Sequence, residues 1–275
     1  MATQVEYGKP ILLTVRNVEV YLVDQGSGIP TLFLHGSPES ADLWSEIITR
    51  LSPHYRCLAP DLPGYGRSSA PTDFDCSLDN LAGYIDDLVG AVGITQPLNL
   101  VVHDLGGVYG LAWAVKHPQK VRRLVITNAP FSSEYHWHIF ARIYRTPILG
   151  ELSLRMISRW AFARVVRRGC GARKLTHDQI NHTYDLITPS VKRMMLRLYR
   201  ALDPEVFKGW EDELRGLAVR VPSLVLWGDR DPWIPIRFAD LFGAQQVEHL
   251  VECGHWPPVE ASQEVSTRLL RFLGE

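Results

Sequence analysis

An aspartate at a sharp turn between a strand and a helix is the feature of this sequence that most limits how it can fold. The apolar run 98–102 predicts a buried parallel strand, and 108–116 predicts a helix. Asp104 lies between them and is followed by Gly106 and Gly107, which let the backbone turn tightly. A strand, a tight turn and a helix in this order are typical of a nucleophile held at the edge of a sheet.

The residue type at this turn limits the chemistry. A carboxylate that attacks an acyl carbon would form an anhydride, whereas attack on an sp³ carbon forms an ester that water can then cleave. Asp104 therefore predicts a reaction at a saturated carbon, through a covalent ester.

Strand and helix patterns alternate in the first half of the chain and return near its end. Predicted strands cover residues 11–15, 18–23, 31–34, 55–59, 98–102, 121–127 and 219–227, and predicted helices cover 44–51, 80–92, 108–116 and 264–273. The first two strands are expected to form a hairpin. This alternation predicts an α/β fold with a mostly parallel central sheet flanked by helices.

Residues 131–212 interrupt the alternation with helical spacing and little strand signal. They contain 14 Lys and Arg against 8 Asp and Glu, whereas the rest of the chain contains 15 against 22. A basic helical segment inside an acidic α/β pattern indicates an inserted cap. We therefore expect a core of residues 1–130 and 213–275, with a helical cap insertion at 131–212.

Composition excludes several kinds of partner. The net charge of −1 gives no support for nucleic-acid binding, and no run reaches the ~18 apolar residues of a membrane span. The first nine residues lack the apolar core of a signal peptide, and the four cysteines show no paired spacing. No metal-ligand cluster or nucleotide-binding motif is present. We expect a cytoplasmic protein with a small apolar substrate, no cofactor, no metal, no nucleic acid, no membrane and no obligate protein partner.

Three residues in separate parts of the sequence form a candidate catalytic triad. Asp231 follows the apolar run 224–227, and His255 lies in a loop after Gly254. The order nucleophile, acid, histidine is that of α/β-hydrolases. Asp104, Asp231 and His255 are therefore predicted to be nucleophile, orienting acid and general base.

A fourth predicted element is an oxyanion hole. The run His35-Gly36-Ser37-Pro38 follows a strand, so its backbone N–H groups are exposed at the strand end. Those of Ser37 and Leu105 could converge on one oxygen. Pro38 is also a candidate for a cis peptide bond.

The sequence resembles α/β-hydrolases of the aspartate-nucleophile branch, which includes epoxide hydrolases and haloalkane dehalogenases. The resemblance covers nearly the whole chain and rests on runs 35–40, 59–68, 103–107, 228–231 and 254–256. The runs Gly64-Tyr-Gly-Arg-Ser68 and Gly254-His-Trp-Pro-Pro-Val-Glu260 are similar to epoxide hydrolases. Val101-Val-His-Asp104 is closer to dehalogenases. The fold this implies is an α/β-hydrolase fold with a cap.

The resemblance also implies roles for cap residues. Epoxide hydrolases place two cap tyrosines over the nucleophile to protonate the opening oxygen, the second often in a Tyr-Tyr-Arg-Ala-like run. Leu198-Tyr199-Arg200-Ala201 is similar, which points to Tyr199. Tyr135 is the best match for the first tyrosine, with Tyr144 as the alternative. Four further residues are expected to contact substrate: Trp44, His103, Trp137 and Trp256.

Three functions stay open, of which epoxide hydrolysis is the first. Dehalogenases typically hold halide with a Trp after the nucleophile and an Asn or a second Trp elsewhere, and those positions here are Leu105 and Ser37. Because leucine offers no N–H donor in its side chain, haloalkane dehalogenation is the alternative. A non-catalytic ligand-binding protein on the same scaffold is the third.

Overall fold

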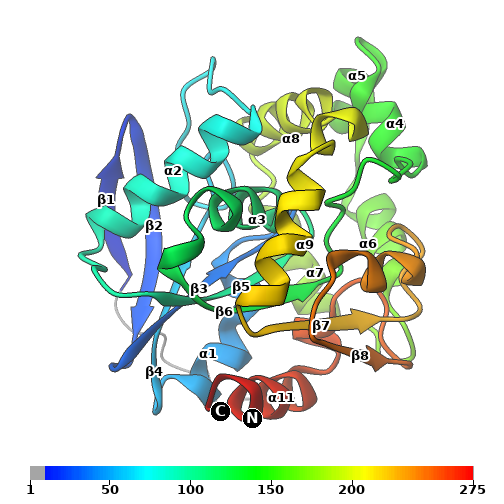
Figure 1. Ribbon diagram of the computed structural model, residues 1–275. Coiled ribbons are helices and arrows are strands. Elements are labelled where there is room, and N and C mark those ends of the chain that lie inside the picture. The colour runs from blue at the N-terminus through cyan, green and yellow to red at the C-terminus, as the bar shows by residue number, and fades with distance from the viewer. Residues whose placement is uncertain (1–9, 275) are drawn as a thin grey trace.

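Eight strands form one sheet in the part of the chain that the structure, a computed structural model, describes (residues 10–274; Figure 1). The first nine residues, whose sequence lacks the apolar core of a signal peptide, lie outside that part. The strands are β1 (Ile11–Val15), β2 (Val18–Gln25), β3 (Ile29–Leu34), β4 (Tyr55–Pro60), β5 (Leu98–His103), β6 (Val121–Thr127), β7 (Ser223–Gly228) and β8 (Gln246–Leu250). Their order is β1-β2-β4-β3-β5-β6-β7-β8. The β1–β2 and β2–β4 pairs are antiparallel, and every other pair is parallel.

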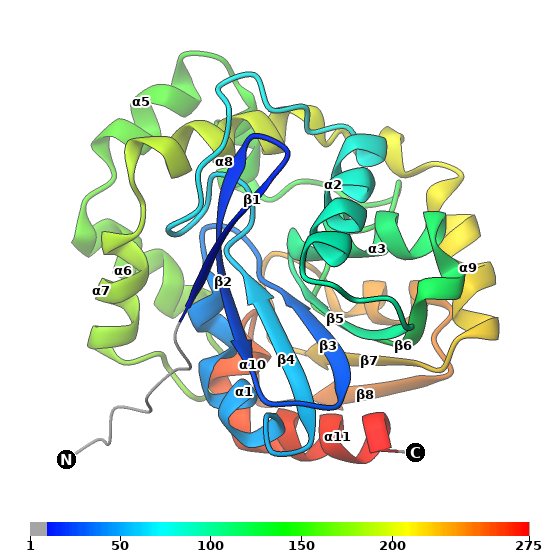
Figure 2. The ribbon, with the colours of Figure 1, turned by 90° about the vertical axis from the view of Figure 1, so that its left-hand side faces the viewer.

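Helices cover both faces of the sheet, as apolar parallel strands require. One face carries α2 (Leu78–Ala91), α3 (Gly106–Lys116) and α9 (Trp210–Arg220), and the other carries α1 (Ser45–Leu51) and α11 (Ser262–Gly274) (Figures 1 and 2). Short helices connect these elements: η1 (Ala41–Trp44), η2 (Pro118–Lys120), η3 (Pro204–Phe207), η4 (Ile236–Phe242) and α10 (Pro257–Glu260). Every residue of β5 and β7 is buried. The central strands therefore form a rigid platform.

A helical insertion lies over the edge where the central parallel strands end (Figure 2). It contains α4 (Ile139–Arg145), α5 (Leu149–Met156), α6 (Arg159–Gly169), α7 (His177–Asp185) and α8 (Pro189–Ala201). Thr188 caps the start of α8 and Pro189 occupies its first turn, where a missing N–H costs nothing. The predicted fold class, a flanked and mostly parallel sheet with a helical insertion, is confirmed. The boundaries at 131 and 212 stay a prediction, and α9 spans the second of them.

Two strand assignments differ from the structure. Residues 219–222 were expected to begin a strand, but α9 continues to Arg220 and β7 begins at Ser223. Strand β8 was not predicted, because its sequence Gln-Val-Glu-His-Leu is mostly polar and only Leu250 is buried. A strand at the edge of a sheet is partly exposed, so it can contain polar residues. It therefore lacks the continuous apolar run that identifies the central strands.

Candidate active site

The turn after β5 holds Asp104 in a strained backbone conformation. Asp104 has φ of 46°, a region that non-glycine residues rarely occupy. A Cβ on Gly106 would collide with the carbonyl oxygens of Leu34 and His35. A Cβ on Gly36 would lie 2.5 Å from Asp104 Oδ2. The glycines on both sides of the turn therefore allow β3 and the Asp104 carboxylate to approach closely.

The two carboxylate oxygens of Asp104 have different neighbours. The backbone N–H of Ser37 donates to Oδ2 at 2.9 Å, and the N–H of Leu105 also hydrogen-bonds the carboxylate. Oδ1 lies 3.9 Å from Nε2 of His255. Burial raises the pKa of Asp104, while His255 and the two N–H groups lower it, with a net increase. The structure brings the predicted oxyanion-hole groups onto the predicted nucleophile, and the Ser37–Pro38 bond is cis.

His255 is oriented by Asp231. Nδ1 of His255 lies 2.7 Å from Asp231 Oδ2. Asp231 also accepts from Asn128 Nδ2 at 2.9 Å and from the backbone N–H groups of Trp233 and Ile234. Four hydrogen bonds fix this carboxylate and, through it, the imidazole ring.

The charges around His255 favour its protonated form. Burial lowers the pKa of the imidazole, but the carboxylates of Asp231, Asp104 and Glu39 outweigh burial and raise it to about 9. The resting site therefore holds a proton on His255 at neutral pH. Loss of the negative charge on Asp104 would remove one of these contributions and make the neutral imidazole easier to form.

A cavity of about 330 Å³ connects the triad to the cap. Asp104, His255 and Ser37 line it from the core. All three candidate tyrosines line it as well: Tyr135 before α4, Tyr144 on α4 and Tyr199 on α8. Its other walls are mainly apolar, including residues of α4, α5 and α6. This composition suits a small apolar substrate.

The tyrosines differ in what their hydroxyl groups contact. The Tyr135 hydroxyl donates to the carbonyl oxygen of Trp233 at 3.1 Å. The hydroxyl groups of Tyr144 and Tyr199 have no hydrogen-bond partner among residues 10–274, and their rings lie 5.6 Å apart. Burial raises the pKa of Tyr144 to about 12, and burial followed by the Asp104 charge raises that of Tyr199 well above its usual value. Tyr144 is therefore better placed than Tyr135 to act beside Tyr199.

Of the four predicted substrate contacts, two line the cavity and two do not. Trp137 and Trp256 line it. Trp44 and His103 are fully buried beneath it, with their rings 6.5 Å apart, so their assignment as substrate contacts was wrong. His103 ends β5 with its ring centroid 5.0 Å from that of His255, and Trp44 ends η1, but neither side chain reaches the cavity wall.

Sequence reasoning missed several polar residues of the site. Trp233 and His138 line the cavity, and burial lowers the pKa of His138 to about 4. Glu39 is buried, and its Oε1 accepts from Trp256 Nε1 at 2.6 Å, while Oε2 has no partner in the described chain. Burial, followed by the charge of Asp104, raises the pKa of Glu39 to about 7. Glu39 stands in the motif 35–40, but no sequence signal shows that its carboxyl group is buried near the triad.

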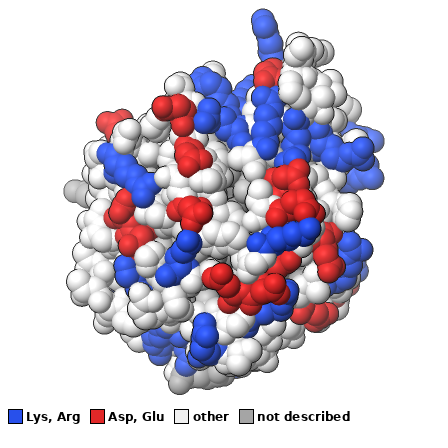
Figure 3. Space-filling model, turned by 45° about the horizontal axis from the view of Figure 1, so that its top comes forward, with Lys and Arg blue, Asp and Glu red and all other residues white. Residues whose placement is uncertain are grey.

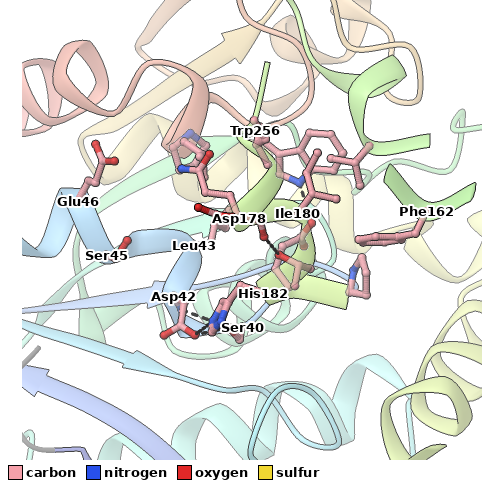
Figure 4. Close-up of a pocket in the computed structure, with 18 of the residues that line it drawn as sticks. Ser40, Asp42, Leu43, Ser45, Glu46, Phe162, Asp178, Ile180, His182 and Trp256 are labelled. Carbon is pink, nitrogen blue, oxygen red and sulfur yellow. Dashed lines mark hydrogen bonds and ion pairs between the residues drawn. The ribbon is translucent and has the colours of Figure 1, made fainter. Parts of the chain in front are cut away.

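A second and larger cavity, of about 510 Å³, lies between α7 and the η1–α1 turn (Figure 4). It contains no triad residue, although Glu39, Phe162 and Trp256 contribute to its wall. Asp42 and His182 face each other there, with Oδ2 and Nε2 2.7 Å apart, and link the core to the cap. The smaller cavity is the candidate active site because it alone of the two contains Asp104 and His255.

The four cysteines are buried and unpaired. Among residues 10–274, no group of His, Cys, Asp and Glu is arranged to hold a metal ion. None of the helices between residues 10 and 274 combines the length and apolar character of a membrane span.

Comparison with known proteins identifies the scaffold. Residues 30–146 match the family model described as the alpha/beta hydrolase fold. The solved structure of the epoxide hydrolase CorEH without ligand has a TM-score of 0.82 at 21% identity, covering 96% of this chain and 98% of that one.

Relatives with several activities share this scaffold. Cis-3-alkyl-4-alkyloxetan-2-one decarboxylase of Shewanella oneidensis is 25% identical over 277 residues, 94% of this chain and 86% of the relative. Epoxide hydrolase 3 of Mus musculus is 29% identical over 271 residues, 90% of this chain and 71% of the relative. Haloalkane dehalogenase of Agrobacterium fabrum is 43% identical over 105 residues, 38% of this chain and 34% of the relative. The protein thus has the α/β-hydrolase fold, with epoxide hydrolases and haloalkane dehalogenases among its relatives.

Proposed function

We propose that this protein hydrolyses small apolar epoxides through an ester on Asp104. Oδ1 of Asp104 attacks the less hindered ring carbon, and the C–O bond of the ring breaks. The oxygen that leaves takes a proton from Tyr199, with Tyr144 as the second donor. Oδ2 accepts a hydrogen bond from the N–H of Ser37 and becomes the carbonyl oxygen of the ester, and the N–H of Leu105 also hydrogen-bonds the carboxylate.

Water completes the reaction. Once Asp104 is esterified, its charge no longer raises the pKa of His255, so the imidazolium gives up its proton, which restores the Tyr199 phenol and leaves His255 as the neutral base. His255 removes a proton from water as the water oxygen attacks Cγ of the ester, and the N–H groups of Ser37 and Leu105 stabilise the oxyanion. The bond between Cγ and the substrate oxygen then breaks, the proton of the hydroxyl group added to Cγ passes to that oxygen, and the diol leaves. Asp104 is again a carboxylate, and His255 keeps the proton taken from water, as in the resting site.

The observation that carries this proposal is the Tyr199 hydroxyl. Tyr199 lines the same cavity as Asp104, and its hydroxyl has no hydrogen-bond partner among the described residues. Its raised pKa keeps the phenol protonated and able to donate. An epoxide oxygen leaves as an alkoxide and needs such a donor, whereas a halide leaves without a proton.

Dehalogenation is the second candidate, and Trp233 favours it. Trp233 lines the cavity, its ring centroid lies 4.7 Å from that of His255, and no hydrogen bond of its indole N–H to a described residue is present. Against it, Leu105 offers no side-chain donor, and the Trp137 N–H already donates to the carbonyl oxygen of Leu202 at 2.9 Å. A halide held by one indole N–H is bound more weakly than a halide held by two side-chain N–H donors.

Mass spectrometry of His255→Gln tests the chemistry. With styrene oxide, this variant should accumulate an adduct on the peptide that contains Asp104, because the ester forms but is not hydrolysed. Asp104→Ala should show neither adduct nor diol. The absence of any adduct would contradict the mechanism.

A substrate panel separates the leaving groups. Wild-type protein should form diol from styrene oxide and release little halide from short bromoalkanes. An oxetan-2-one belongs in the panel because the name of the Shewanella oneidensis relative specifies that ring. Bromide release without diol would favour dehalogenation, and thermal stabilisation by these compounds without turnover would favour a binding protein.

A further inference from the structure

An apolar patch is exposed on the cap. This apolar patch consists of Ile148, Leu149, Leu152, Met156 and Trp160, whose exposed fractions lie between 49% and 79%. Leu149, Leu152 and Met156 follow one another at helical spacing along α5, and Trp160 lies in the first turn of the next helix, α6. Single exposed apolar residues are ordinary, but several together indicate a surface that meets something apolar.

The part of the chain that carries this patch has an excess of positive charge. Within the described chain, six exposed arginines between residues 142 and 173 form no ion pair: Arg142, Arg155, Arg164, Arg167, Arg168 and Arg173. Glu151 is the one acidic residue between 139 and 173, and it accepts hydrogen bonds from Arg200. Figure 3 shows Lys and Arg side chains gathered in the upper part of that face, where the cap lies.

Basic and apolar groups are in direct contact at one edge of the patch. The guanidinium of Arg164 lies over the Trp160 ring, 5.9 Å from its centroid. Tryptophan beside arginine is typical of side chains at a lipid–water interface, where the indole enters the headgroup layer and the cation meets phosphate.

The catalytic cavity reaches the surface at this patch. Met156 belongs to the patch and also lines the cavity that contains Asp104. Its neighbours Ile157 and Ala161 line the same cavity. An apolar molecule that enters beside Met156 would therefore pass from the patch to the nucleophile.

We propose that the apolar patch docks on the surface of an anionic lipid bilayer, from which apolar substrate enters the cavity beside Met156. The arginines complement the negative headgroups, while Trp160, Leu152 and Ile148 enter the headgroup layer. A second copy of this chain fits less well, because a symmetric contact would bring two basic surfaces together. The sequence predicted no membrane partner, but that expectation rested on the lack of a spanning segment, which surface docking does not need.

Vesicle sedimentation tests the proposal without any need for turnover. Wild-type protein should sediment with vesicles of equal parts phosphatidylcholine and phosphatidylserine, and far less with phosphatidylcholine alone. The double variant Leu152→Ser with Trp160→Ser should bind at least about tenfold more weakly, since it removes two inserted side chains. Arg164→Glu with Arg168→Glu should have a similar effect and abolish the dependence on phosphatidylserine.

A matched control replaces the same number of exposed apolar side chains at positions outside the patch. Val219 and Val251 are 72% and 61% exposed and lie on α9 and after β8. Val219→Ser with Val251→Ser should leave vesicle binding unchanged. Equal loss of binding in this control would overturn the proposal, as would failure of the wild-type protein to bind the anionic vesicles.

Two further measurements separate the remaining outcomes. Sedimentation velocity should give a monomer for wild-type protein without lipid. A dimer that Leu152→Ser with Trp160→Ser converts to a monomer would assign the patch to a second copy and overturn the proposal. Turnover of a short, water-soluble epoxide should be the same in wild-type and variant protein. If neither turns it over while vesicle binding differs, the proposed function fails and the docking surface stands.

Discussion

At the scale of single residues, the charge on Asp104 links the two chemical steps. In the resting site this charge helps to raise the pKa of His255 to about 9, so the imidazole carries a proton. Ester formation removes the charge, and the pKa of His255 falls at the moment when a base is needed. Asp231, fixed by Asn128 and two backbone N–H groups, keeps the ring in place throughout.

Tyr199→Phe should slow epoxide opening by about 10²-fold, because it removes the proton donor and almost no volume. Tyr135→Phe should have a much smaller effect, since that hydroxyl already donates to the Trp233 carbonyl oxygen. Single-turnover diol formation measures both. Halide release, if any is found, should be nearly unchanged in Tyr199→Phe. Equal losses in the two variants would contradict the assignment of Tyr199 as the donor.

Glu39→Gln should change how stability depends on pH. Burial raises the pKa of Glu39 from 4.5 to about 7, so the unfolded chain releases this proton at a lower pH than the folded protein. Wild-type stability therefore falls as pH rises from 4.5 to about 7, and the loss is complete above that. The variant avoids this loss, which is roughly 3–4 kcal/mol at most.

Urea unfolding at about pH 5 and about pH 8 measures this difference. The variant should gain stability relative to wild-type protein at the higher pH, and Gln can still accept from Trp256. Glu134→Gln, at an exposed position, is the control and should change the unfolding free energy by less than about 0.5 kcal/mol at either pH. If the variant were instead more stable than wild-type protein at about pH 5 and not at about pH 8, the pKa of Glu39 would not be raised by folding.

Several residues of the candidate site could be predicted from the sequence because local patterns specify their positions. Asp104, Asp231 and His255 each follow a strand or a glycine, and the structure places them together. His103 lies in the same motif as Asp104, and Trp44 lies four residues after the run 35–40, yet both are buried outside the cavity wall. Trp233 and Glu39 were missed because nothing local shows which side chains a folded cap and core enclose.

At the scale of elements, the turn between β5 and α3 depends on space supplied by β3. The chain after β3 passes so close to Asp104 that Gly36 has no room for a side chain. The central strands could be predicted from their apolar runs, whereas β8 could not, because it is a polar edge strand. The end of α9 was also missed, since the apolar residues of 217–221 continue directly toward β7.

Gly36→Ala should reduce kcat/KM by about 10²-fold or more, because its Cβ would displace the nucleophile and a misplacement near 1 Å has that effect. The new Cβ would lie 2.5 Å from Asp104 Oδ2. Gly90→Ala on α2 is the matched control: no atom lies within 4 Å of its Cβ, and a helical alanine should raise stability slightly. Steady-state kinetics and thermal unfolding of both variants measure the effect. Normal activity in Gly36→Ala would mean that Asp104 tolerates displacement.

At the scale of the whole molecule, a rigid sheet carries a cap that is packed less completely. All six residues of β5 and all six of β7 are buried, whereas only Gly150 and Leu154 are buried among the eight residues of α5. The acid, base and nucleophile therefore stand on the rigid layer, and the tyrosines and the cavity mouth stand on the cap. A movement that widens the opening beside Met156 would then involve the cap alone.

Hydrogen exchange should show this division directly. Amides of β5 and β7 should exchange only through global unfolding, while those of α5 should exchange through local opening at rates at least about 10³-fold higher. Mass spectrometry of peptides from the two regions measures the contrast. Peptides from α2, a helix with seven buried residues among its 14, provide a control on the core and should exchange more slowly than those of α5. Equal protection of α5 and β5 would mean that the cap and the sheet unfold as one unit, and substrate would then have to enter through a static opening beside Met156.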